Sequence, residues 1–207
     1  MKVLLVNGSP HEKGCTNRAL EEVQKTLIKN GVEAEIYWIG REPISGCLGC
    51  GACRKTGGNC VINSDKVNEF TEKAKTADGF IFGSPVHYAS AGGAIISFMD
   101  RAFYSGAAAL RYKPAAAVVS CRRAGGTATF DVINKYFTIC SMPIVSSNYW
   151  NEVHGSRAED VQQDIEGLQT MRVLGYNMAW LLKCIELGKG AGIEPEKENK
   201  IYTNFVR

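Results

Sequence analysis

The stretch from Met1 to Asn17, which reads MKVLLVNGSPHEKGCTN, decides the fold expected for this chain. Its apolar run, Val3 to Val6, does not alternate with polar residues, which is typical of a strand covered on both faces. A loop of small residues follows, and a helix is predicted from about Asn17. The unpaired N–H groups of a first helical turn favour an anion. We therefore predict a phosphate site between Gly8 and Asn17.

The sequence of this loop restricts which phosphate it can hold. Cys15 follows Gly14, so the loop lacks the Gly-Lys-Ser/Thr ending of a nucleotide triphosphate-binding loop, and G-x-G-x-x-G is also absent. The side chains of Ser9, Thr16 and Asn17, together with backbone amides, suit a monophosphate held without metal, as in flavin mononucleotide (FMN). Taken alone, the loop is more typical of an ordinary strand-to-helix turn than of a phosphate site.

Composition indicates one soluble α/β domain. The chain has 207 residues, 45% of them hydrophobic, and a net charge of +3 from scattered Lys and Arg, so binding to nucleic acid is not expected. It has neither the apolar segment of a signal peptide nor a run long enough to cross a membrane, so we expect a cytoplasmic protein. In that compartment eight cysteines do not indicate a disulfide framework.

Strand-like and helix-like segments alternate through residues 1–190, which predicts a doubly wound, five-stranded parallel sheet with helices on both faces. The predicted strands are 3–6, 33–39, 79–83, 115–120 and 143–146. The predicted helices are 17–30, 64–77 capped by Ser64, 94–104, 130–139, and 156–188 opened by the capping box Ser156–Glu159. The tail, residues 191–207, is expected to pack on the domain or on a partner subunit.

Three loops should meet at the carboxyl edge of this sheet, where such folds bind ligands. They are residues 8–17, 84–93 and 120–127. All three are rich in small residues, which allow the backbone to approach a flat ligand closely. Their shared position favours a cofactor pocket over an ordinary turn.

A connection at about residues 41–63 is long for a compact domain and carries four cysteines. Cys47, Cys50, Cys53 and Cys60 have the spacing C-x2-C-x2-C-x6-C, and four thiolates in one arc suit a [4Fe–4S] cluster. Structural zinc more often uses two separated C-x-x-C pairs. The alternative is a metal-free set of packing or redox thiols, which the neighbouring Arg54 and Lys55 would favour as thiolates.

Three motifs together resemble the NADPH-dependent FMN reductase family, and in particular its iron–sulfur flavoprotein branch. They are G-S-P-H-E-K-G-C-T at residues 8–16, C-L-G-C-G-A-C-R-K-T-G-G-N-C at 47–60 and G-S-P-V-H-Y at 83–88. The resemblance implies a flavodoxin-like fold, bound FMN, and a [4Fe–4S] cluster on the four cysteines close to the flavin. It also suggests a homodimer or homotetramer.

The resemblance also implies which residues contact FMN. The phosphate and ribityl end would lie on Ser9, His11, Cys15, Thr16 and Asn17. The isoalloxazine ring would lie between two groups: Pro85, Val86, His87 and Tyr88 on one side, and Cys121, Arg122, Gly125, Gly126 and Thr127 on the other. Cys15 departs from the branch, which often has Asn at this position, and a thiol is a weak hydrogen-bond donor.

We therefore expect an FMN-dependent oxidoreductase that takes hydride from NAD(P)H and passes electrons to a small acceptor or, through the cluster, to a protein partner. Because the flavin supplies the chemistry, no catalytic side chain is expected. One alternative is a cluster-free reductase of quinones, azo compounds, nitroaromatics or flavin; another is a flavodoxin-like electron carrier, which the pI of about 8.4 disfavours. The roles of Tyr149, Trp150 and His154, as substrate pocket, core or interface, stay open.

Overall fold

The computed structural model describes residues 1–199, 201–203 and 205. Five parallel strands form a sheet in the order β2-β1-β3-β5-β6, and a short strand, β4, pairs antiparallel with the end of β3. The strands are β1 (Lys2–Asn7), β2 (Glu33–Trp38), β3 (Gly79–His87), β4 (Ser90–Ala91), β5 (Ala115–Cys121) and β6 (Glu152–His154). The predicted doubly wound α/β fold is confirmed.

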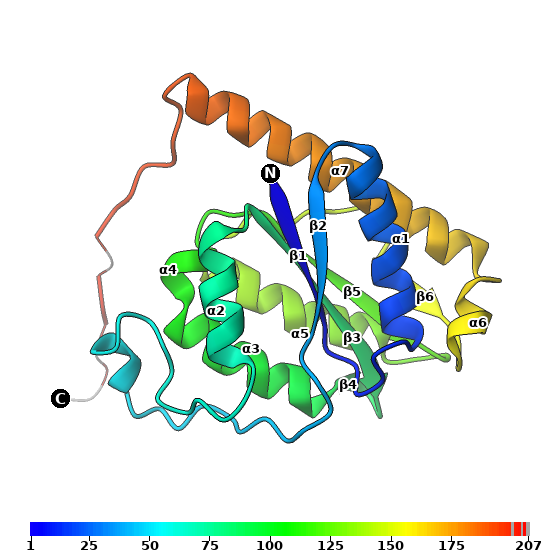
Figure 1. Ribbon diagram of the computed structural model, residues 1–207, viewed down its shortest axis with the longest axis horizontal. Coiled ribbons are helices and arrows are strands. Elements are labelled where there is room, and N and C mark those ends of the chain that lie inside the picture. Colours follow the sequence, from blue (N-terminus) through cyan, green and yellow to red (C-terminus); the bar gives the residue numbers. More distant parts are fainter. Residues whose placement is uncertain (200, 204, 206–207) are drawn as a thin grey trace.

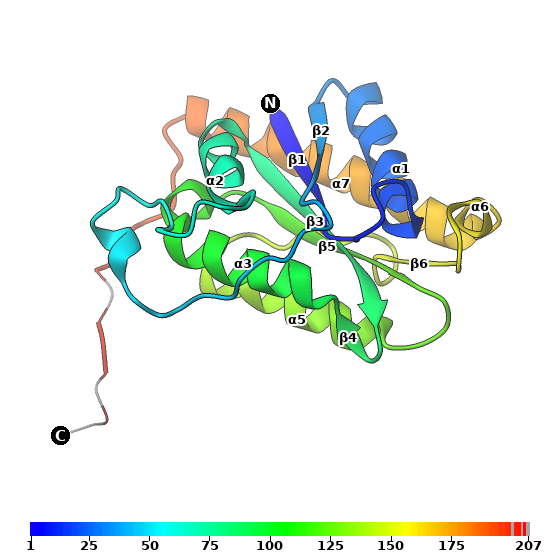
Figure 2. The ribbon, with the colours of Figure 1, turned by 60° about the horizontal axis from the view of Figure 1, so that its bottom comes forward.

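Helices cover both faces of the sheet (Figures 1 and 2). One face carries α1 (Cys15–Lys29) and α7 (Ile165–Gly190), with the short α6 (Ala158–Val161) beside them. The other face carries α2 (Val67–Thr76), α3 (Gly93–Ser105), α4 (Ala107–Leu110) and α5 (Gly126–Ile139). The two apolar clusters that these helices form with the sheet are separate, as expected for buried strands with side chains on alternate faces.

Strand β1 lies in the centre and is buried from Val3 to Val6. Alternate residues enter the two clusters, since Val3 and Leu5 face α1 and α7 whereas Leu4 and Val6 face α2 and α3. The second cluster includes a packed group of phenylalanines, with Phe70 lying 5.2 Å from Phe98 between ring centroids. Burying such side chains contributes about 1.5–3 kcal/mol each. The core therefore fixes the strand ends from which the site loops start.

Strand β3 is longer than predicted. Its register with β1 ends at Asn7 and Gly83, but pairing with β5 continues to Pro85 and Ser120. Beyond Gly83 the strand has a main-sheet neighbour on only one side, and such an edge position tolerates a proline that has no N–H to donate. Part of the predicted 84–93 loop is therefore a hairpin of β3 and β4.

The predicted strand at residues 143–146 was wrong. Ile144 makes a single bridge to Ala115, and the chain then leaves the sheet and returns as β6 at Glu152. The buried Asn151 side chain marks the return, because its Nδ2 donates to the Ala117 carbonyl at 3.0 Å. The apolar run at residues 143–146 therefore lies beside β5 but forms only one β-bridge with it.

The boundaries of three helices also differ from prediction. The last helix is divided into α6 and α7, because Asp164 caps the start of α7 through Oδ1 and the Gly167 N–H. The predicted Ser156–Glu159 capping box does not form; Asp160 Oδ2 instead accepts from the N–H groups of Ser156 and Arg157, both at 2.9 Å. Helix α2 begins after Lys66 rather than at Ser64, and α5 begins at Gly126 rather than Phe130.

After α7 the predicted tail runs down one side of the domain (Figure 1), and its first residues, among them Ile193 and Pro195, line a cavity with Tyr112 and Lys113. Ile201, Tyr202 and Phe205 are exposed, so the tail does not bury them on this chain's own domain. Lys200, Asn204, Val206 and Arg207 of the predicted tail lie outside the described residues. Among the described helices, none has both the length and the apolar character needed to cross a membrane.

Candidate functional site

A cavity of about 750 Å³ opens at the carboxyl edge of the sheet. It is lined by the β1–α1 loop, the ends of β2, β3 and β5, and the connection from β6 to α6. Cofactor sites usually have volumes of about 300–1,000 Å³ and lie at this edge of doubly wound sheets. Its size and place suit a mononucleotide cofactor.

The β1–α1 loop is shaped by Asn7, which the sequence analysis did not single out. Asn7 is fully buried, and its Oδ1 accepts from the Ser9 N–H at 3.0 Å while its Nδ2 donates to the Glu12 carbonyl at 3.0 Å. Ser9 Oγ in turn accepts from the His11 N–H at 3.1 Å. These bonds fold residues 8–14 into a compact turn directly before α1.

The loop is also tied to its neighbours in the sheet. The Trp38 indole N–H donates to the Ser9 carbonyl at 2.8 Å, and the Gly8 N–H donates to the Gly83 carbonyl at 2.9 Å. A Cβ on Gly8 would lie 2.7 Å from Ile95 Cβ and 2.8 Å from the Gly83 carbonyl oxygen. Glycine is required at residue 8 because α3 and β3 both approach its backbone.

The first turn of α1 contacts the end of β5 and the connection after β6. Thr16 Oγ1 lies 2.8 Å from Ser120 Oγ, and Cys15 Sγ donates to the Gly155 carbonyl at 3.5 Å. Burial raises the pKa of the Cys15 thiol, and the charge of Asp160 acts in the same direction. Cys15 is therefore a neutral donor that joins two walls of the cavity, which gives this departure from the branch a structural role.

Most of the predicted flavin residues line this cavity: Ser9, His11, Cys15, Thr16, Pro85, Val86, His87, Cys121 and Arg122. Asn17 does not line it, because the side chain is buried and its Nδ2 donates to Glu21 Oε1 at 2.8 Å. Tyr88 is fully exposed at the β3–β4 turn, with a φ of 57°. Gly125, Gly126 and Thr127 also lie outside the cavity lining. Gly125 directly precedes α5, and Gly126 and Thr127 are its first two residues.

The cavity is also lined by Trp38 and by a basic set formed by Lys13, Arg41 and Arg157, none of which was predicted from the sequence. Trp38 lies near the end of the predicted second strand and Arg41 just beyond it. The carboxyl end of that strand must share this edge, so strand order could have identified both residues. Arg157 could not be found in this way because the strand before it was misplaced. Together with Arg122, these cations make the cavity suitable for anions.

Tyr149, Trp150 and His154 line a separate cavity of about 200 Å³, together with Glu152 and Asp164. The Tyr149 and Trp150 rings are in contact, with centroids 4.9 Å apart and planes tilted by 58°, and Trp150 is about half exposed. Burial raises the pKa of the Glu152 carboxyl, and nearby His154 opposes this shift. These aromatics are therefore neither core residues nor part of the large cavity.

The four clustered cysteines line one small cavity with Arg101 and Tyr104 of α3. All four thiols are free; Cys47 and Cys50 are exposed, whereas Cys53 and Cys60 are half-buried. Gly49, Gly51, Gly57 and Gly58 all have φ between 63° and 98°, the left-handed region that favours glycine. These glycines therefore allow turns within the cysteine segment that other residues would adopt only with strain.

The spacing of these thiols bears on the kind of metal. A single tetrahedral zinc with bonds of about 2.3 Å brings sulfurs to about 3.8 Å of one another, whereas in a cluster each thiolate binds a different iron. Among the described residues, the group with three ligand atoms within 4.8 Å of one another is Cys121, Glu152 and His154, not the clustered cysteines. No three of the four clustered thiols therefore lie as close together as a mononuclear zinc site requires.

Comparisons with known proteins agree with this architecture. The chain is 33% identical over 199 residues to an iron-sulfur flavoprotein of Methanocaldococcus jannaschii, covering 90% of this chain and 100% of the relative. It is 27% identical over 190 residues to an iron-sulfur flavoprotein of Methanosarcina thermophila, covering 90% and 97%.

Solved structures share the fold at low sequence identity. RosB, solved with a bound riboflavin-phosphate intermediate, aligns with a TM-score of 0.73 at 13% identity, covering 100% of this chain and 92% of that one. A WrbA-like flavodoxin of Agrobacterium tumefaciens aligns with a TM-score of 0.61 at 18% identity, covering 88% and 96%. The model of the NADPH-dependent FMN reductase family matches residues 1–156. On this evidence, the chain belongs to the NADPH-dependent FMN reductase family.

Proposed function

We propose that this protein is an FMN-dependent oxidoreductase that accepts hydride from NAD(P)H and passes electrons to a small acceptor or, through a [4Fe–4S] cluster, to a protein partner. The observation that carries the proposal is the large cationic cavity at the carboxyl edge of the sheet, beside the first turn of α1. Membership of the family supports the same assignment.

The residues present suit FMN. The N–H groups at the start of α1 and the hydroxyls of Ser9 and Thr16 would hold the phosphate, as an anion at a helix N-terminus. Pro85, Val86 and His87 from β3, Cys121 from β5 and Arg122 directly after β5 would line the ring. When bound, FMN would supply the hydride and electron transfer. The protein's contribution is to orient the ring, exclude water from it and donate hydrogen bonds near its edge.

The basic set of Lys13, Arg41 and Arg157 would attract the phosphates of a nicotinamide dinucleotide. Arg41 and Arg157 are exposed, so they can contact a ligand that enters the cavity from solvent. Charge of this kind mainly speeds the encounter and weakens with salt. The proposed electron donor is therefore expected to bind more weakly as ionic strength rises.

Cys47, Cys50, Cys53 and Cys60 would hold the cluster, which would transfer one electron at a time. A cluster-free reductase of small acceptors is the second candidate, favoured by the exposure of Cys47 and Cys50, which would leave a cluster open to oxygen. We also propose a homodimer or homotetramer, supported by Trp180 and Leu187, which are 66% and 75% exposed on α7.

Anaerobic purification followed by a visible spectrum, FMN analysis and iron and sulfide assays tests both cofactors. NAD(P)H should then bleach the flavin, and an added quinone should restore its absorbance with continued NAD(P)H oxidation. Flavin that neither NADH nor NADPH reduces would refute the reductase and favour an electron carrier. Iron absent from both purified and reconstituted protein would refute the cluster and favour the second candidate. Cys50→Ser should abolish the cluster and leave FMN bound.

A further inference from the structure

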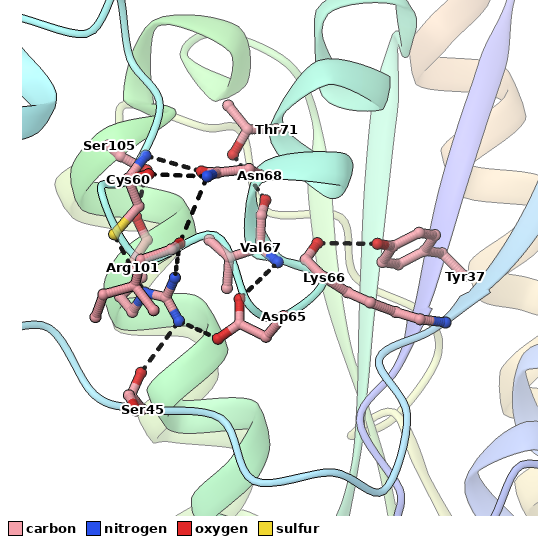
Figure 3. Close-up of polar contacts among 11 residues, drawn as sticks. Tyr37, Ser45, Cys60, Asp65, Lys66, Val67, Asn68, Thr71, Arg101 and Ser105 are labelled. Carbon is pink, nitrogen blue, oxygen red and sulfur yellow. Dashed lines mark hydrogen bonds and ion pairs between the residues drawn. The ribbon is translucent and has the colours of Figure 1, made fainter.

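Residues of two helices hold Cys60, one bonded to its backbone and the other to its side chain (Figure 3). Asn68 of α2 makes paired bonds to its backbone: Oδ1 accepts from the Cys60 N–H and Nδ2 donates to the Cys60 carbonyl, both at 2.8 Å. Arg101 of α3 donates from Nε to Cys60 Sγ at 3.3 Å. Both the backbone and the sulfur of Cys60 are therefore fixed.

Arg101 also contacts both ends of the cysteine segment. Its Nη1 donates to the Ser45 carbonyl at 3.4 Å, before Cys47, and its Nη2 donates to the Ile62 carbonyl at 2.6 Å, after Cys60. Nη1 forms an ion pair with Asp65, whose other oxygen accepts from the Val67 N–H at the start of α2. One guanidinium thus joins the entry and exit of the segment to α3 (Figure 3).

The burial of Arg101 makes these contacts electrostatically important. The residue is 1% exposed, and the side chain of Asp65 is 9% exposed. At a buried site, where the effective dielectric constant is low, a charge interacts with its neighbours more strongly than at the surface. An N–H group that donates to a thiolate sulfur favours the reduced cluster, because that state carries more negative charge. Hydrogen bonds to the thiolate sulfurs are among the known determinants of cluster potential.

We propose that Arg101 is the positioning residue for the fourth cluster ligand, holding Cys60 Sγ in place and raising the reduction potential of the cluster through its charge. The inference rests on the proposed function, since it requires that the four cysteines hold a cluster. It assigns Asp65 the opposite effect, because this carboxylate partly neutralises the guanidinium.

The test compares full-length wild type with Arg101→Gln, Asp65→Asn and, as a matched control, Arg172→Gln. Arg172 pairs with Glu22 at 2.9 Å between α7 and α1, away from the cysteines. Each protein is reconstituted anaerobically with iron and sulfide. The readouts are iron per chain, the rate of cluster loss to a chelator, and the midpoint potential from an electron paramagnetic resonance titration.

R101Q should lose its cluster to the chelator about tenfold faster than wild type and show a lower potential. D65N should shift the potential upward, whereas a purely structural pair would not predict opposite signs for the two variants. R172Q should match wild type in every readout. If R101Q does not fold, the potential of the D65N cluster provides the test. A D65N potential equal to or below that of wild type overturns the inference.

Two failures are distinguishable. In the first, wild type carries the cluster, and R101Q folds with the same potential and the same resistance to the chelator. This result overturns the role of Arg101 and leaves the proposed function intact. Wild type that binds no iron after reconstitution overturns the cluster and the role of Arg101 together, while flavin reduction by NAD(P)H still tests the oxidoreductase.

Discussion

Thr16 Oγ1 and Ser120 Oγ lie 2.8 Å apart although 104 residues separate them in the chain. The bond joins the first turn of α1 to the end of β5, and both side chains are buried. It therefore fixes the distance between the proposed phosphate loop and the proposed flavin wall.

Replacing Thr16 with Val should remove both the bond between these two walls and a hydroxyl proposed to hold the FMN phosphate. The change preserves shape but leaves the Ser120 hydroxyl without its partner, at a cost of about 1–3 kcal/mol. We expect lower FMN affinity and a lower free energy of unfolding, measured by flavin fluorescence titration and urea denaturation. Thr138→Val, at an exposed position on α5, is the control; equal FMN affinity in the two variants would contradict the prediction.

Asn7→Ala should weaken FMN binding more than it affects the rest of the fold. The substitution removes both side-chain bonds that close the β1–α1 loop, and losing two such bonds should reduce affinity about tenfold or more. Isothermal titration with FMN measures the change. The control is Asn30→Ala, which removes a bond at the far end of α1 and should lower stability without changing FMN affinity.

Gly8→Ala should destabilise the protein. The added methyl would meet Ile95 and the Gly83 carbonyl at less than 3 Å, and overpacking of this kind typically costs about 1–3 kcal/mol. Thermal unfolding of the apo-protein gives the comparison. Gly93→Ala adds the same methyl where nothing lies within 4 Å, so a similar loss in both variants would show that glycine flexibility, not close approach, is responsible.

Glu152→Gln should increase stability, and the gain should grow with pH. Burial raises the pKa of Glu152 above its ordinary value of 4.5 in the folded state, so the folded chain holds the proton more tightly than the unfolded chain. Stability from this group is therefore complete below pH 4.5 and is lost as pH rises through the folded-state pKa. Thermal midpoints of the variant and wild type should converge near pH 4 and diverge by pH 7.5.

Substitution of the exposed Glu42 by Gln provides the control for this pH series. It should leave the difference from wild type constant across the range. A gain in Glu152→Gln that does not change with pH would assign the effect to packing rather than to ionisation.

The strands of the sheet centre could be predicted because a strand buried on both faces has a continuous apolar run. β6 could not, since Glu152-Val153-His154 buries only its middle residue, whereas Ile144 belongs to an apolar run that makes a single bridge. The loops of the cavity followed from strand order. Strand order also places Trp38 at this edge, but it does not predict the bonds of Asn7 to Glu12 and of Trp38 to Ser9, because these depend on how the loop folds back.

Helix α3 serves both proposed sites. Ile95 packs against Gly8 of the phosphate loop, and Arg101 holds the cysteine segment. The two residues are six positions apart on one helix, and inserting or deleting a single residue between them would rotate one relative to the other by about 100°. That short interval should therefore tolerate substitutions far better than changes in length.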